Sequence, residues 1–206
     1  MTDHIYLASQ SPRRSQLLEQ IGVRHELLLA GLAEDAEALE AEREGESPHA
    51  YVERVTRAKL EAACARRAAR GLPEAPVLCA DTTVALGELI LGKPADDADA
   101  RRMLRLLSGA THLVISAVAV APHGRTEEAA DPLLAISTSP VQFAPLDEAR
   151  IDAYIASREP FGKAGAYGIQ GRAATWVSRI EGSYSGIMGL PLHETAALLA
   201  RSGVRI

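Results

Sequence analysis

Short apolar segments alternate with segments that have the marks of helices along most of the chain. Residues 5–8 form an apolar run, and Ser11-Pro12 directly after it is typical of a helix start, with a cap residue followed by proline. The same pair recurs at Ser47-Pro48, before a second and longer helix. Strands that alternate with helices predict a fold of the α/β class.

The remaining pattern extends this alternation to the C-terminus. We expect further strands at residues 25–29, 77–80, 81–86, 89–91, 112–120, 133–143 and 176–180. We expect helices at residues 12–21, 48–70, 96–107, 147–156 and 193–201, and a loop at 182–191. Because several strands follow one another through hairpins, the sheet should be mixed. We therefore expect one domain of residues 1–206, with a mixed central sheet flanked by helices and two lobes around a cleft.

Composition excludes several classes of function. The net charge of −5 argues against a protein that binds nucleic acid polymers, and only 4% of residues are aromatic, too few for a stacking platform. No apolar run approaches the roughly 20 residues that span a bilayer, and no signal peptide is evident. Two cysteines without ligand spacing do not suggest a disulfide or zinc framework. We expect a cytoplasmic protein with no membrane partner.

Charged residues are unevenly distributed. The 22 basic residues include only three lysines, Lys59, Lys93 and Lys163. Chance explains such scarcity as well as a special role does. Residues 34–46 hold seven acidic groups and one arginine, and a solvated loop is the better interpretation for most of them.

Residues 7–14 are the first candidate site. An apolar strand runs there into a helix start that carries Arg13 and Arg14. Free backbone N–H groups at a helix N-terminus and paired arginines favour a phosphate. The alternative is an ordinary cap with two surface arginines.

Three further segments carry chemistry. Asp81, expected at the end of an apolar strand, could hold a divalent cation or accept a proton from water, or it could simply cap a turn. Gly92-Lys93 offers a close backbone approach and a point charge for phosphate. In the glycine-rich residues 161–171, Gln170 could recognise a base edge, although a bulge that needs glycine is equally plausible.

Seven segments together resemble one family, and they occur in order over essentially the whole chain. They are LASQSPRR (7–14), YVERVTRAKL (51–60), ADTTV (80–84), ILGKP (90–94), LSGATH (107–112), KAGAYGIQG (163–171) and GSYSGIMGLPL (182–192). The chain is similar to the Maf proteins, of the Maf/Ham1 group of nucleotide pyrophosphatases. That resemblance implies an inosine-triphosphatase-like fold. The sequences of the motifs resemble those of the branch that acts on dTTP and UTP.

The resemblance also implies roles for particular residues. Asp81 matches the proton acceptor, and Glu34 matches a functional glutamate that would hold a divalent metal, Mg²⁺ or Mn²⁺, with it. The remaining matches are substrate-binding positions: Ser9, Ser11, Arg13, Arg14, Lys59, Thr82, Lys93, Lys163 and Gln170. Gly162 stands where the family often has aspartate, which puts a charge partner for Lys163 in doubt.

The implied activity is hydrolysis of a nucleoside triphosphate to a monophosphate and pyrophosphate, which would remove surplus or modified nucleotides. One alternative is the sister activity on 7-methyl-GTP, which Thr82 and Gln170 disfavour. A second is a non-catalytic regulator of septum formation that binds a division partner, for which the acidic residues 34–46 would serve. The resemblance is compatible with a homodimer, which no residue establishes.

Overall fold

The computed structural model describes residues 4–31, 34, 38–122 and 132–206. Its strands are β1 (Ile5–Leu7), β2 (His25–Leu27), β3 (Val77–Leu86), β4 (Leu89–Leu91), β5 (Thr111–Ala121), β6 (Leu133–Phe143) and β7 (Val177–Ile180). Its α-helices are α1 (Pro12–Gln20), α2 (Pro48–Ala69), α3 (Asp97–Leu107), α4 (Glu148–Ala156), α5 (Tyr184–Met188) and α6 (Leu192–Arg201). Short 3₁₀ turns occupy Ala38–Glu40, Ala164–Ala166 and Arg172–Thr175.

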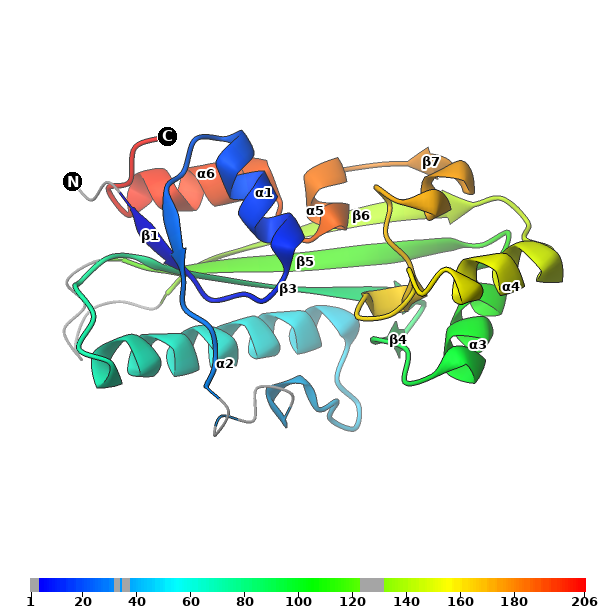
Figure 1. Cartoon of the computed structure of the whole chain (residues 1–206), viewed down its shortest axis with the longest axis horizontal. Coiled ribbons are helices and arrows are strands. Elements are labelled where there is room, and N and C mark those ends of the chain that lie inside the picture. The colour runs from blue at the N-terminus through cyan, green and yellow to red at the C-terminus, as the bar shows by residue number, and fades with distance from the viewer. Residues whose placement is uncertain (1–3, 32–33, 35–37, 123–131) are drawn as a thin grey trace.

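The strands form one seven-stranded mixed sheet in the order β2-β1-β3-β5-β6-β7, with β4 also paired to β3. β1 is parallel to β2 and β3, whereas β3, β5, β6 and β7 pair in antiparallel fashion. Three long strands carry the sheet from one end of the molecule to the other (Figure 1). The expected mixed sheet flanked by helices is thus confirmed.

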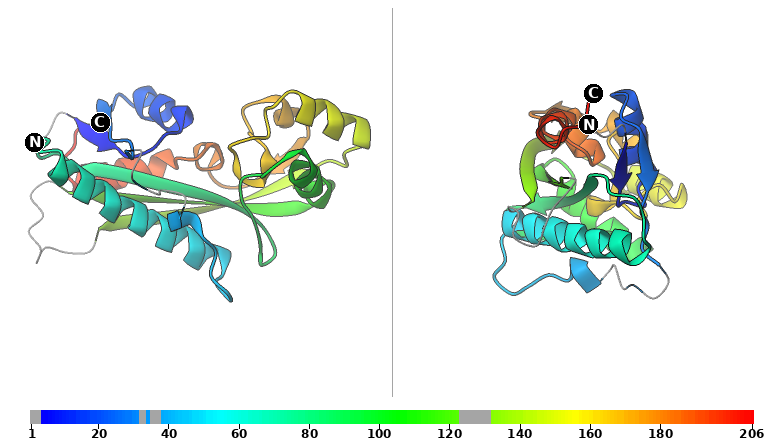
Figure 2. Two further views of the ribbon diagram at one scale, coloured as in Figure 1. Left: turned by 60° about the horizontal axis from the view of Figure 1, so that its bottom comes forward. Right: turned by 90° about the vertical axis from the view of Figure 1, so that its left-hand side faces the viewer.

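Helices cover the two faces of the sheet in separate layers. α2 lies along one face, while α1 and α6 lie on the other (Figure 2). Val52 and Val55 of α2 pack on Ile115, and Leu18 of α1 and Leu198 of α6 share the opposite core. α3 and α4 lie apart from these helices, beside the far ends of the long strands, so that two lobes share one sheet (Figure 1).

The edge of β3 that faces β1 has a gap in its strand pairing. On this edge of β3, β1 pairs only with Val77 and Leu78, and β4 pairs with Val84–Leu86. Among the described strands, none pairs with residues 79–83 on that edge, although β5 pairs with all of them on the other. This gap lies between the two lobes, and it places Asp81 at an opening.

Two sequence predictions about this region are corrected. Asp81 was expected at the end of a strand, but β3 continues through it because β5 pairs with β3 from Val77 to Ala85. Residues 182–191, expected to be a loop, contain the short helix α5, which Ser183 caps by accepting a hydrogen bond from Gly186 N. Residues 123–131, between the strands expected at 112–120 and 133–143, lie outside the described residues.

Candidate active site

Alternation along β3 directs neighbouring residues to opposite faces of the sheet. Cys79 packs on the α2 side and Ala80 on the side of α1 and α6. Asp81 therefore points toward α2, and Thr82 points toward α1. Because both lie at the gap in pairing, one strand supplies the same opening with a carboxylate and a hydroxyl.

A chain of ionic hydrogen bonds connects α2, β3 and the segment after β4. Lys59 Nζ donates to Asp81 Oδ1 at 2.5 Å and to Glu40 Oε1 at 2.7 Å. Lys93 Nζ donates to Glu40 Oε2 at 2.8 Å. Two carboxylates and two ammonium groups thus alternate along one wall of the opening. Of the three lysines, Lys59 and Lys93 share this arrangement, whereas Lys163 lies outside it.

The charges in this chain stabilise one another. Burial lowers the pKa of Lys59, but the neighbouring charges of Asp81 and Glu40 and the hydrogen bonds to both outweigh that effect and raise the pKa overall. Burial raises the pKa of Glu40, but Lys59 and Lys93 together bring it below its usual value. Lys59 and Glu40 are therefore both charged at neutral pH.

The start of α1 faces the same opening and carries the two arginines. Arg14 Nε donates to Gly189 O at 2.7 Å, and its Nη1 donates to Ser9 Oγ at 3.0 Å. Arg13 Nε donates to Met188 O at 3.2 Å. The side chain of Ser11, at the N-cap, makes no capping hydrogen bond, so it does not compete with an anion for the first N–H groups of the helix.

Thr82 is tied into a short polar network behind the opening. Its Oγ1 lies 2.7 Å from Ser116 Oγ, which donates to Gly186 O at 2.7 Å. Arg14 Nη2 reaches Thr82 Oγ1 at 3.5 Å. The network links β3, β5, α5 and α1, and so fixes the Thr82 hydroxyl relative to the arginines.

The glycine-rich residues 163–171 form the opposite rim. Lys163 Nζ donates to the backbone carbonyl of Glu159, which is the partner it finds in place of an aspartate at position 162. Burial and the nearby charge of Arg13 lower the pKa of Lys163. A cation that is partly desolvated beside another cation favours an anionic ligand.

These elements enclose a cleft of about 1180 Å³. Every residue predicted for the site lines it: Ser9, Ser11, Arg13, Arg14, Glu34, Lys59, Asp81, Thr82, Lys93, Lys163 and Gln170. Of the described residues, six cationic side chains and three carboxylates line the cleft, a local excess of positive charge in a chain whose net charge is −5. The cleft therefore attracts a polyanion although the whole protein is acidic.

Glu40 is the site residue that the sequence analysis missed. Glu34, the glutamate expected beside Asp81, instead pairs with Arg66 at 2.6 Å, and this contact, with a hydrogen bond from Gly31 N, lowers its pKa to about 2. Glu40 occupies the position next to Lys59 and Asp81. Both residues come from the acidic segment 34–46, where no local pattern separates a solvated carboxylate from a functional one.

The chain also matches a family model. The model described as Maf-like protein matches residues 4–202. The chain belongs to the Maf family. This result confirms the resemblance drawn from the motifs, and the matched region of this Maf protein contains every residue of the cleft named above.

Curated relatives are similar over almost their full length. The protein named dTTP/UTP pyrophosphatase from Ralstonia nicotianae (strain ATCC BAA-1114 / GMI1000) is 63% identical over 98% of this chain and 96% of its own. The one of the same name from Polaromonas sp. (strain JS666 / ATCC BAA-500) is 61% identical over 99% of this chain and 98% of its own. A solved HAM1 protein from Coxiella burnetii is 15% identical, with a TM-score of 0.52 over 97% of this chain and 100% of that one. The last similarity shows that the Maf chain shares the Ham1-type fold.

Two kinds of feature are absent from the described residues. Among the described residues, no group of three or more His, Cys, Asp or Glu side chains is placed to hold a metal ion. In the same part of the chain, no helix is both long and apolar enough to cross a membrane.

Proposed function

We propose that this Maf protein hydrolyses dTTP and UTP to the nucleoside monophosphate and pyrophosphate. The observation that carries the proposal is the cleft itself, where Lys59 contacts the carboxylate of Asp81 and where Lys93 and Arg13 line the same opening. A triphosphate carries about four negative charges, which must be offset before a nucleophile can reach phosphorus. The printed names of the relatives support the same substrates.

Asp81 is proposed to accept the proton of the attacking water. Lys59 engages its Oδ1, so we assign Oδ2 as the proton acceptor. The water attacks the α-phosphorus, the bond from that phosphorus to the bridging oxygen breaks, and pyrophosphate leaves. Lys93 and the arginines of α1 would stabilise the negative charge that develops on the leaving phosphates.

Two neighbouring carboxylates offer oxygen donors to a divalent cation. Asp81 and Glu40 both contact the ammonium of Lys59, so their oxygens converge on one small region. Mg²⁺ in nucleotide enzymes is held by one or two carboxylates while phosphate oxygens and water complete the shell. We propose that Asp81 and Glu40 hold Mg²⁺ or Mn²⁺, which when bound would activate the water and neutralise phosphate charge. Glu34, the glutamate implied by the motif comparison, remains the alternative ligand.

Base recognition is assigned to the rim formed by residues 163–171. Gln170 is exposed at the cleft and carries both an amide donor and a carbonyl acceptor. Uracil and thymine present the same polar edge and differ by one methyl group, which a pocket distinguishes by only about 1–3 kcal/mol. Action on both bases follows from this small difference.

Pyrophosphate release from UTP, dTTP, CTP and 7-methyl-GTP, with and without Mg²⁺, tests the proposal. We expect Mg²⁺-dependent release with UTP and dTTP and much less with the others. Release only with 7-methyl-GTP would favour the sister activity, and no release from any nucleotide would contradict the proposal. Gln170→Glu should change the order of substrates, and an unchanged order would remove Gln170 from base recognition.

We also propose that residues 1–206 form a single domain, since one sheet draws strands from Ile5 to Ile180. A cytoplasmic location is a separate proposal, which rests on the sequence. A homodimer is compatible with the family resemblance and has no other support. Sedimentation of the purified chain distinguishes a dimer from a monomer.

A further inference from the structure

His112 is a buried polar residue that the proposed chemistry does not use. It lies on β5 with 1% of its surface exposed, on the side of the sheet away from the ion pairs of Asp81. Burial lowers its pKa to about 4, so its imidazole is neutral at physiological pH. One ring nitrogen, Nε2, forms a hydrogen bond of 2.8 Å with the hydroxyl of Tyr167.

The other ring nitrogen lacks a partner. In the described part of the chain, no hydrogen-bonding atom reaches His112 Nδ1. An unpaired buried polar atom is destabilising, and an apolar ring of similar size would avoid that cost. Since Phe143 and Tyr167 already contact the imidazole edge-on, at centroid distances of 5.0 and 5.4 Å, a phenyl ring suits this environment. Stability alone therefore does not explain a histidine here.

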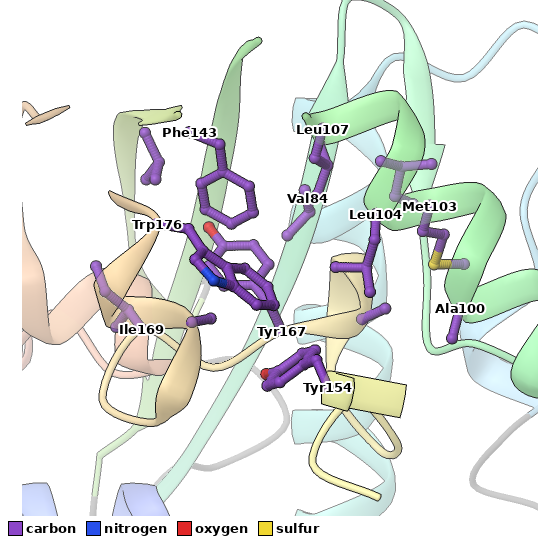
Figure 3. Packing of buried hydrophobic residues seen from close by; sticks show 14 of the residues in the cluster. Val84, Ala100, Met103, Leu104, Leu107, Phe143, Tyr154, Tyr167, Ile169 and Trp176 are labelled. Carbon is purple, nitrogen blue, oxygen red and sulfur yellow. The ribbon is translucent and has the colours of Figure 1, made fainter. Parts of the chain in front are cut away.

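Tyr167 connects His112 to the cleft. Its ring is buried beside Phe143 at a centroid distance of 4.8 Å, and it lines the cleft between Lys163 and Gln170 in the chain. Figure 3 shows Tyr167 with Phe143, Trp176 and Tyr154 in one aromatic cluster. The hydrogen bond between His112 and Tyr167 thus holds the middle of the rim that carries the proposed base-recognition residue.

The backbone before Tyr167 is strained. Gly165 and Ala166 have φ values of 66° and 60°, in the left-handed region that alanine rarely adopts. Gly165 N donates to Gly92 O at 3.0 Å, so the same turn also fixes the position of the backbone next to Lys93. A strained turn persists only where its surroundings hold it, and the buried bond to Tyr167 is such a restraint.

We propose that His112 is a positioning residue that fixes the rim of residues 163–171 through its hydrogen bond with Tyr167, and so orients Gln170 toward the base. The inference rests on the proposed function, because it assigns the rim to recognition of a pyrimidine. Gln170 has a donor and an acceptor on one amide, so its discrimination between uracil and cytosine depends on a fixed orientation.

The test compares His112→Phe, Tyr167→Phe and the double variant. Each single variant should raise KM for UTP about three- to tenfold, the effect of one lost hydrogen bond, with a smaller change in kcat. The ratio of kcat/KM for UTP to that for CTP should fall. The double variant should be no worse than either single variant, because both remove the same bond. The melting temperature of His112→Phe should not fall below that of the wild type.

Controls separate this role from a purely structural one. Thr111→Val, on an exposed position of the same strand, should match the wild type. His112→Gln, which can still hydrogen-bond Tyr167, should restore part of the UTP to CTP ratio. An unchanged KM and an unchanged ratio in folded His112→Phe, or additive effects in the double variant, would overturn the proposal.

Amide hydrogen exchange gives a readout that does not depend on the substrate. Residues 163–171 should exchange faster in His112→Phe than in the wild type, while α2 exchanges at the same rate. If wild-type protein released no pyrophosphate but this exchange result held, the proposed function would fail and the positioning role would stand. Equal exchange in both proteins would overturn the positioning role itself.

Discussion

Lys59 Nζ lies 2.5 Å from Asp81 Oδ1, which joins the middle of α2 to the middle of β3. The side chains of both residues are mostly buried, at 18% and 12% exposure, so water screens the pair weakly. α2 packs along β3 through buried valines, and this packing fixes the positions from which the two side chains meet. The packing of α2 on β3 therefore positions this ion pair in the candidate site.

Replacing Lys59 should reduce activity much more than replacing a surface residue of the same helix. Lys59→Met removes the donor shared by Asp81 and Glu40, and we expect kcat/KM to fall about 10²-fold, as when one preorganised charged donor is lost. Arg57→Met, on the same helix but paired with Glu53 at the surface, is the matched control and should keep full activity. Steady-state pyrophosphate release measures both. Equal activity in the two variants would separate Lys59 from the reaction.

Removing the base should abolish most turnover without unfolding the chain. Asp81→Asn keeps the shape of the side chain but loses its charge and its ability to accept a proton, so kcat should fall by about 10²-fold or more. The circular dichroism spectrum should remain that of the wild type. Near-normal turnover in a folded Asp81→Asn variant would exclude Asp81 as the base.

The two glutamates should differ in their effect on metal dependence. Glu40→Gln should raise the Mn²⁺ concentration required for half-maximal activity by about tenfold or more, because a charged ligand becomes neutral. Glu34→Gln breaks a contact with Arg66 outside the ion-pair chain and should leave that concentration close to the wild-type value. Titration of activity with Mn²⁺ distinguishes them. The reverse order would make Glu34 the ligand.

The turn at Gly165 should tolerate no side chain. A Cβ at this position would lie 2.9 Å from both methyl carbons of Val84, and its φ is already positive. Gly162 also has a positive φ but nothing within 4 Å of such an atom. Gly162→Ala should therefore cost about 1–2 kcal/mol of unfolding free energy from backbone strain, and Gly165→Ala should cost about 1–3 kcal/mol more from the clash. Urea denaturation measures both, and equal losses would contradict the role of Val84.

His112 should make the protein less stable in acid. Its pKa is lowered to about 4 in the folded state, against 6.5 for an ordinary histidine side chain, so the unfolded chain binds more protons between these values. Stability therefore falls as the pH decreases through that window, by up to about 3 kcal/mol for a shift of this size. In His112→Phe this part of the loss should disappear. Parallel stability profiles for the two proteins from pH 7 to pH 4 would contradict the assignment.

Local sequence patterns predicted much of the fold. The Ser-Pro pairs at 11–12 and 47–48 mark the starts of α1 and α2, because proline suits the first helical turn, where no hydrogen-bond donor is needed. The strands expected at 77–80 and 81–86 are one continuous strand, and the sequence suggested a break because Asp81 is an unusual residue inside a buried strand. Pairing with β5 is a long-range effect that outweighs the local preference.

The sequence motifs also predicted many of the residues that line the cleft. The motif positions converge on one cleft, which spacing alone could not establish. The choice between Glu34 and Glu40 required the structure, since both lie in one acidic segment and only the path of the chain brings Glu40 between Lys59 and Lys93. Likewise, nothing in the sequence around His112 indicates its bond with Tyr167, because the two residues are far apart in the chain.

Hydrolysis of UTP in ¹⁸O-labelled water tests the central claim most directly. Attack on the α-phosphorus predicts UMP and pyrophosphate in equal amounts, with the label in UMP and none in pyrophosphate. Mass spectrometry of the two products locates the label. Label in pyrophosphate, or formation of UDP and phosphate, would contradict the proposed reaction.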